Sequence, residues 1–178
     1  MRGKSIYLRP LQTSDAKAKL ELEKDNRKLF EKVSMTRYPD FYTEIIQKEI
    51  IEIGIEQREE GNEYTFGIFA NDDDRLIGTI SLFHIMRGAL QKAFLGYALD
   101  KAHTNKGYTT EAVKLVVDYA FRKLELHRIE AGVMPNNIPS IRVLEKAGFH
   151  KEGIAVKNVQ INGKWEDHQV LAIINPKD

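Results

Sequence analysis

The feature that most constrains this fold is an apolar run followed by a short polar loop and a strongly periodic helical segment. The run spans Phe94 to Leu99, and the loop reads His-Thr-Asn-Lys-Gly-Tyr-Thr-Thr-Glu from His103 to Glu111. Apolar residues then recur at helical spacing, at Ala112, Val113, Val116, Val117, Ala120, Phe121 and Leu124. Because a helix with one apolar face must bury it against another layer, we predict a strand, a loop and a helix packed as one α/β unit.

The segments before this unit predict two helices and a set of antiparallel strands. The first helix is capped by Thr13 or Ser14, reaches about Lys32, and is followed by a break at Tyr38-Pro39-Asp40. The second starts at Thr43, ends at Gly61 and carries Ile45, Ile46, Ile50 and Ile53 on one side. Strands are expected at Ser5 to Leu8, Tyr64 to Ile68, Arg75 to Met86 and Lys92 to Leu99.

The segments after the unit predict one more helix and three more strands. Strands are expected at Arg128 to Val133, Ile154 to Ile161 and Lys164 to Ile174, and Asn162-Gly163 is a hairpin signal between the last two. A short helix from Ser140 to Ala147 is closed by Gly148.

Length and composition predict one cytoplasmic domain, residues 1–178. A chain of 178 residues is long enough to bury about 70% of its unfolded surface in a single core. Lys and Arg number 27 against 26 Asp and Glu, so no basic field favours direct binding of nucleic acid. With no cysteine the chain has no disulfide, thiolate nucleophile or zinc-cysteine site, and we expect no metal. No apolar run approaches the about 20 residues of a membrane span, and Met1-Arg2-Gly3-Lys4 leaves no room for a signal peptide.

The loop from His103 to Glu111 also suggests a phosphate site. The first turn of a helix leaves backbone N–H groups unpaired and carries a partial positive charge, so it can hold an anion without a basic side chain. Gly107 is the residue that permits close approach. A glycine before a helix is also common as simple loop geometry.

Two ordered motifs identify a family resemblance. "NKGYTTEAVKLVVDYAF" and "HRIEAGVMPNNIPSIRVLEKAGFHKEG", preceded by "FLGYALD", cover roughly Phe94 to Gly153. They resemble the acetyl-CoA-binding core of the GNAT superfamily of N-acetyltransferases, most closely the ribosomal-protein-alanine N-acetyltransferases. The resemblance implies an α/β (α+β) fold with a mixed, mostly antiparallel sheet flanked by helices. It also implies that the sheet is splayed between the strands at Phe94 and Arg128, where acetyl-CoA binds as co-substrate.

The resemblance also assigns cofactor-binding positions. In the family, the strand backbone bonds the thioester oxygen and the pantetheine arm, which places this role at Tyr97, Ala98 and Leu99, although the segment can also be read as a plain core strand. The family's phosphate loop aligns with Thr104 to Thr109, and Thr110 follows it. The loop residues implicated are Thr104, Asn105, Lys106, Gly107, Tyr108, Thr109 and Thr110.

This phosphate loop departs from the family pattern, since only Gly107 matches outright. Thr104 replaces a long polar side chain, and Thr109 adds a branched side chain where a small residue is usual. Thr109 can instead cap the helix or donate to a phosphate, and Lys106 adds positive charge nearby.

The second block supplies the remaining candidates. The resemblance implies that Asn137 bonds the pantetheine arm, with Asn136 as the alternative, and that Ser140 lies near the sulfur as the proton donor. Ser140 is equally a candidate N-cap of the short helix. Arg142 can meet the nucleotide's phosphates, although a solvated helical face explains it as well.

The sequence does not identify a general base. Of five histidines, His84 is the first choice because its strand should end near the active cleft, although a partly buried structural role is the common alternative. Glu111 is interpreted as a helix-start and packing residue. A protein N-terminus, with a pKa of about 7.7 to 8.0, is about a tenth neutral at pH 7, whereas a lysine at about 10.4 is neutral less than one part in a thousand.

These pKa values and the resemblance favour acetylation of a protein N-terminal α-amine, such as that of a ribosomal protein. The alternatives are a small amine (a polyamine, an amino acid or an antibiotic) and a non-catalytic CoA-binding module. The resemblance places the acceptor near Phe30 to Tyr42 and Gln160 to His168, whose Tyr38, Phe41, Tyr42 and Trp165 either line a peptide groove or complete the core. Oligomeric state, a homodimer included, is left open.

Overall fold

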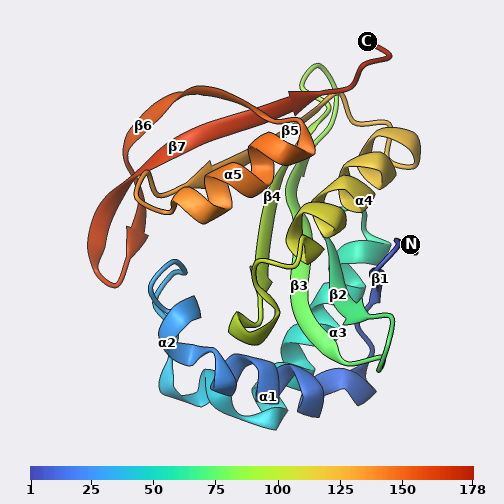
Figure 1. Ribbon diagram of the computed structural model, residues 1–178, viewed down its shortest axis with the longest axis vertical. Helices are drawn as coiled ribbons and strands as arrows, with labels where there is room; N and C mark the ends of the chain where they lie inside the picture. The colour runs from blue at the N-terminus through green and yellow to red at the C-terminus, as the bar shows by residue number, and fades with distance from the viewer.

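The computed structural model describes all residues from Met1 to Asp178 and contains one seven-stranded sheet with helices on both faces (Figure 1). The strands are β1 (Ile6–Pro10), β2 (Tyr64–Ala70), β3 (Leu76–Met86), β4 (Lys92–Leu99), β5 (Arg128–Val133), β6 (His150–Ile161) and β7 (Lys164–Ile174). Their spatial order is β1-β2-β3-β4-β5-β7-β6. Every neighbouring pair is antiparallel except β4 and β5, which are parallel. The predicted mixed, mostly antiparallel sheet is confirmed.

The helices divide between the two faces of this sheet. They are α1 (Ala16–Asp25), α2 (Arg27–Phe30), α3 (Glu44–Glu59), α4 (Tyr108–Arg122) and α5 (Ile138–Ala147). Apolar residues of α4 and α5 join the main core with the sheet, whereas α1 and α3 contribute Leu22 and Ile51 to a second, smaller core. The two helices that follow the predicted motifs therefore share one face.

The predicted apolar face of α4 is the best-buried helical surface of the main core. Ala112, Val113, Val116 and Ala120 have no exposed surface, and Val117 and Leu124 are nearly as buried. Burial of each larger side chain contributes about 1.5 to 3 kcal/mol. This packing holds the first turn of α4 in a fixed position against the sheet.

The sheet opens between β4 and β5, as expected. The two strands pair only from Lys92 opposite Arg128 to Phe94 opposite Glu130. β4 continues to Leu99 while it pairs with β3 on its other edge. Residues 95–99 therefore have no strand partner on the edge that faces β5, which is the predicted splay.

The prediction of a single first helix is wrong. The helix breaks at Asn26, whose backbone leaves the helical region, and α2 ends at Phe30 rather than near Lys32. Asn26 is buried because its side chain donates to the carbonyl of Leu22 at 3.0 Å and accepts from the amide of Lys101 at 2.9 Å. A contact with a distant loop thus overrides the local helical pattern.

The cap predicted for this first helix is also wrong. Neither Thr13 nor Ser14 caps it; the turn begins at Gln12, whose amide donates to Asp15 Oδ2 at 2.7 Å. Arg9 holds the same carboxylate through two hydrogen bonds.

The predicted face of α3 is wrong at Ile45 and Ile53, whereas Ile46 and Ile50 are half-buried. Thr43 does cap the helix, accepting from the amide of Ile46 at 3.4 Å, but Ile45 and Ile53 are 71% and 56% exposed. The buried positions are Gln47 and Ile51. Gln47 faces inward because Lys19 of α1 donates to its side-chain oxygen, so a polar contact sets the rotation of the helix.

The last third of the chain follows the predicted turns. Gly148 ends α5 with a left-handed φ of 103°, and Asn162 and Gly163 connect β6 to β7 with φ of 49° and 79°. β6 begins at His150, four residues earlier than Ile154. No helix in the structure is long and apolar enough to cross a membrane.

Candidate active site

A pair of hydroxyl groups lies where β4 separates from β5. Tyr97 Oη is 2.7 Å from Ser140 Oγ and 3.1 Å from the carbonyl oxygen of Ser140. Tyr97 comes from β4 and Ser140 from the first turn of α5, so this contact spans the opening in the sheet. Of the other predicted strand residues, Leu99 is buried in the main core and Ala98 packs on the second core.

Asn137, and not Ser140, is the N-cap of α5. The helix begins at Ile138, two residues before the predicted start, and Asn137 Oδ1 accepts from the amide of Ser140 at 3.3 Å. Ser140 is therefore the third residue of the helix, and its hydroxyl is free to contact Tyr97. The capping alternative for Ser140 is wrong because the cap position is already occupied.

Burial raises the pKa of Tyr97 to about 12. The hydrogen bond with Ser140 lowers the pKa of Tyr97, but this effect is smaller than the increase caused by burial. Tyr97 consequently stays protonated at neutral pH, and its single proton is shared between the two oxygens of Ser140.

The loop before α4 places a glycine at the helix start. Gly107 is the N-cap residue with φ of 82°, and a Cβ built there would meet no protein atom within 4 Å. The backbone amides of Tyr108, Thr109 and Thr110 donate to no protein acceptor, whereas the Glu111 amide bonds the carbonyl of Gly107. Thr109 lies inside the first turn and does not cap the helix, so that alternative is wrong.

The same loop is tied to the rest of the fold through Asp100. Burial opposes the charge of Asp100, but hydrogen bonds from His103, the Ala102 amide and Asn26 outweigh it and lower its pKa. His103 Nδ1 lies 2.8 Å from Asp100 Oδ2, and the Thr104 hydroxyl donates to the carbonyl of Lys101 at 2.9 Å. Thr104 thus stabilises the loop with the side chain that the resemblance assigned to the cofactor.

The remaining predicted cofactor residues are available to a ligand. Asn105, with φ of 62°, Lys106 and Arg142 are exposed, and Arg142 forms no ion pair within the chain. Free helix amides, two cations and an unpaired strand edge suit a phosphate-bearing ligand with an extended amide arm. The residues present therefore fit CoA. No cluster of three or more potential metal-binding residues is found.

The candidate bases occupy different surroundings. His84 is exposed at an irregularity of β3, with φ of 49°, and its ring packs edge-on against Phe83 and Phe94. Its imidazole makes no hydrogen bond within the chain, so its catalytic role stays a prediction. Glu111 accepts from the amide of Ser5 at 3.0 Å, which supports its interpretation as a packing residue.

The two predicted acceptor regions meet in space. Asn162, at the β6–β7 turn, donates to the carbonyl of Glu31 at 2.8 Å, close to α2 (Figure 1). Tyr42 is buried and donates to the Glu31 carboxylate, whereas Tyr38 and Trp165 are 79% and 56% exposed. The tyrosine at 42 thus completes the core, and the exposed pair remains free for a partner.

A buried polar cluster lies beneath this region, and no sequence pattern predicted it. Glu23 bonds Arg37 at 2.6 Å and lies 3.5 Å from Lys19, which also reaches Gln47. Burial lowers the pKa of Lys19. The i, i+4 spacing of Lys19 and Glu23 was a detectable signal for the pair, but the contact of Glu23 with Arg37 depends on the path of the loop between α2 and α3.

Residues 5–150 match the family described as "Acetyltransferase (GNAT) domain". The chain is 64% identical over 178 residues to a probable N-acetyltransferase of Bacillus subtilis (strain 168), YjcK, covering all of this chain and 98% of the relative. Among solved structures, ribosomal-protein-S5-alanine acetyltransferase from Vibrio fischeri superposes with a TM-score of 0.93 at 31% identity, covering 99% of this chain and 96% of its own. RimJ of Mycobacterium smegmatis, in complex with CoA-disulfide, superposes with a TM-score of 0.92 at 28% identity, covering 97% and 83%.

Proposed function

The chain belongs to the acetyltransferase (GNAT) family and is an N-acetyltransferase, and we propose that it acetylates the N-terminal α-amine of a protein. The observation that carries the proposal is the arrangement at the open edge of β4. That edge leads through an anchored loop to the free amides of α4, and the Tyr97–Ser140 pair spans the opening.

Acetyl-CoA would supply an acetyl thioester and a strongly anionic nucleotide. The free amides of Tyr108, Thr109 and Thr110 can bind its phosphates at the positive end of α4, with Lys106 and Arg142 adding charge. The unpaired edge of residues 95–99 offers backbone hydrogen bonds to the amide-rich arm, as a sheet edge does to an added strand.

The raised pKa of Tyr97 decides how the hydroxyl pair acts. A leaving thiol has a pKa of about 8.5, so a full proton transfer from a phenol whose pKa is about 12 costs about 5 kcal/mol at 1.36 kcal/mol per unit. We therefore infer that Ser140 donates a hydrogen bond to the departing sulfur while Tyr97 donates to Ser140. The final proton then comes from solvent. A positioned donor of this kind contributes about 2.7 to 4 kcal/mol.

The exposed surface on the loop after α2 and on the β6–β7 hairpin supports a peptide acceptor. Met35 and Tyr38, in the loop after α2, are 70% and 79% exposed, and Trp165 is exposed on the hairpin that bonds Glu31. Apolar side chains held on two connected segments are the kind of surface that receives an extended peptide. The neutral fraction of an α-amine at pH 7, about a tenth, is far larger than that of a lysine side chain, which supports the same acceptor.

The test is to offer the purified protein acetyl-CoA with peptides that begin with alanine, with lysine-containing peptides blocked at the N-terminus, and with polyamines. We expect acetylation of the α-amine only, located by mass spectrometry of the product. Turnover of a polyamine without turnover of any peptide would replace the proposed acceptor by a small amine.

A further inference from the structure

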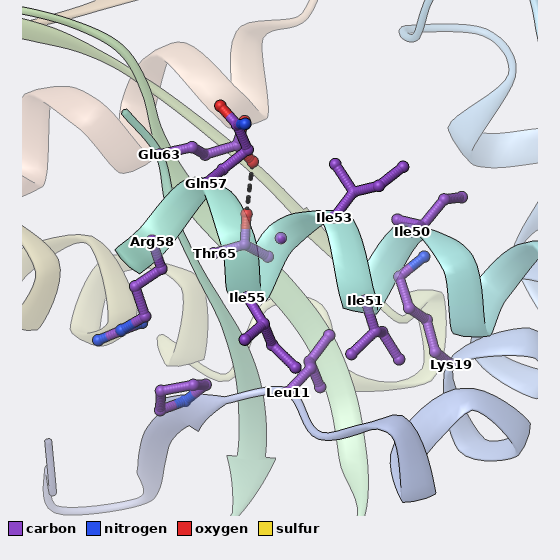
Figure 2. Close-up of a pocket in the computed structure, with 12 residues that line it drawn as sticks. Leu11, Lys19, Ile50, Ile51, Ile53, Ile55, Gln57, Arg58, Glu63 and Thr65 are labelled. Atoms are coloured by element: carbon purple, nitrogen blue, oxygen red, sulfur yellow. Dashed lines mark hydrogen bonds between the residues drawn. The ribbon is translucent and has the colours of Figure 1, made fainter. Parts of the chain in front are cut away.

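Three polar side chains form a continuous hydrogen-bonded chain across β2 and β3. Ser81 Oγ is 2.7 Å from Thr65 Oγ1, and Thr65 Oγ1 is 2.7 Å from Glu63 Oε1. Figure 2 shows the bond between Glu63 and Thr65 beside α3. None of these residues belongs to the Tyr97–Ser140 pair or to the loop before α4.

The direction of the chain follows from the chemistry of its last member. An ionised carboxylate can only accept, so the single proton of Thr65 is donated to Glu63. Ser81 must then donate its own proton to Thr65. The lone pairs of Ser81 Oγ are left free to accept an N–H group.

Ser81 is placed next to the opening in the sheet. It pairs with Gly96 of β4, two residues beyond Phe94, where pairing with β5 ends. Adjacent strands are about 4.8 Å apart, so the backbones of Ser81 and Gly96 lie about 5 Å from each other. Gly96 adds no side chain of its own on this face, where the Phe83 ring lies 3.2 Å from the position of a Cβ built at Gly96.

The hydrogen-bonded chain of Ser81, Thr65 and Glu63 lies on the opposite face of the sheet from the Tyr97–Ser140 pair. Successive residues of a strand point to opposite faces, so Gly96 and Tyr97 face different sides of β4. Two sets of hydroxyl groups therefore approach the open edge of β4 from its two sides, one near the expected sulfur and the other on the side of α1 and α3.

The Glu63 end of this hydrogen-bonded chain reaches a cavity of about 250 Å³, which is lined by Glu63, Thr65 and residues of α3. At Gly54 of α3 a side chain would meet no atom within 4 Å, so this part of the helix surface is open. The other charged groups that line the cavity are Lys19 and Arg58, and the Arg58 guanidinium packs over Tyr64 and Phe66. A proton that reaches Glu63 can exchange with water there.

We propose that Ser81, Thr65 and Glu63 form the path by which the acceptor nitrogen loses its proton, with Ser81 touching the amine and Glu63 as the terminal acceptor. This inference rests on the proposed N-acetyltransferase function. As the nitrogen–carbon bond forms and the carbon–sulfur bond breaks, one N–H proton passes to Ser81. Ser81 passes its own proton to Thr65, Thr65 passes its own to Glu63, and Glu63 releases it to water.

The timing of the transfer follows from the acidities. A free α-ammonium has a pKa of about 7.7 to 8.0, and an ordinary glutamate has a pKa of about 4.3. Proton transfer from an ammonium to a carboxylate is therefore unfavourable before the reaction begins. The nitrogen becomes far more acidic once it has bonded to the carbonyl carbon. The path therefore acts on the reacting nitrogen, while the neutral fraction of the amine is set by the solution.

The test combines a change of basicity with a break in the chain. Glu63→Gln keeps an oxygen that accepts from Thr65 but removes the base, and Thr65→Val removes the linking hydroxyl that Thr65→Ser retains. We expect Glu63→Gln and Thr65→Val to lower kcat by about 10²-fold or more, while the dissociation constant of acetyl-CoA is unchanged and Thr65→Ser keeps most of the activity. The pH profile of kcat should differ between Glu63→Gln and the unmodified protein.

The matched control is Thr79→Val, on the same face of β3 two residues before Ser81, since the Thr79 hydroxyl takes no part in the chain. Thermal unfolding of each variant establishes that it is folded. Equal kcat in Thr65→Val and Thr65→Ser, or an unchanged kcat and pH profile in Glu63→Gln, overturns the proposed path. If the unmodified protein acetylates no amine, the proposed function fails instead.

Discussion

Replacing Gly107 with alanine tests the anion site at the start of α4. The added Cβ meets no protein atom within 4 Å, so the only cost to the free protein is the left-handed φ of 82°. That strain costs about 1 to 2 kcal/mol, which lowers the Tm of a chain of this size by about 2 to 8 °C. The fold should survive.

We expect a larger cost to the bound state, in which the methyl group would stand against a phosphate held by the free amides of Tyr108, Thr109 and Thr110. Loss of one charge-assisted hydrogen bond costs about 1.5 to 3 kcal/mol, which raises the dissociation constant of CoA at least about tenfold. At a CoA concentration a hundredfold above the unmodified protein's dissociation constant, stabilisation by the ligand then falls from about 2.7 to about 1.4 kcal/mol.

The assay is thermal unfolding with and without CoA, together with calorimetric measurement of CoA affinity. Gly88→Ala is the matched control, since Gly88 also has a positive φ, of 67°, and no atom within 4 Å of a built Cβ. It lies in the β3–β4 turn, outside the loop before α4. We expect both variants to lose similar stability without ligand and only Gly107→Ala to lose CoA-induced stabilisation. Equal CoA affinity in the two variants refutes the site.

Three further predictions concern the hydroxyl pair and the acceptor. Ser140→Ala should lower kcat by about 10² to 10³-fold with little change in CoA affinity, whereas Asn137→Ala should lose the cap of α5 and about 1 kcal/mol of stability. Kinetics and thermal unfolding of both variants check this contrast. Full turnover in Ser140→Ala contradicts it. Tyr97→Phe should lower kcat in the same direction with CoA affinity preserved, and equal rates in the variant and the unmodified protein would show that Tyr97 is only a packing residue. The rate with an alanine peptide at subsaturating concentration should rise between about pH 7 and 8 as the amine loses its proton; a flat profile, or acetylation found on lysine, speaks against an α-amine acceptor.

Short-range patterns in the sequence were sufficient for much of the fold. The apolar spacing of Ala112 to Leu124 predicted the buried face of α4, and Asn162-Gly163 and Gly148 predicted a hairpin and a helix end that the structure contains. Such signals succeed because helical periodicity and left-handed turns depend on residues a few positions apart. The motif resemblance added the splay between β4 and β5, which the pairing of these strands confirms.

The rotation of α3 and the break at Asn26 were decided by tertiary contacts. Gln47 is buried because Lys19 of another helix bonds it, and Asn26 leaves the helix to hold the amide of Lys101. Neither partner is close in sequence, so propensity alone predicted the opposite outcome. The functional arrangement depends on the same kind of contact.

Sequence alone determined the family, the order of the strands along the chain, and the loop that begins α4. Tertiary structure alone brought Tyr97 to Ser140, 43 residues away, and aligned Ser81 with Thr65 across two strands. The physical reason is that a hydrogen bond depends on the distance between two atoms, and that distance is set by strand register and helix packing, which no local pattern encodes.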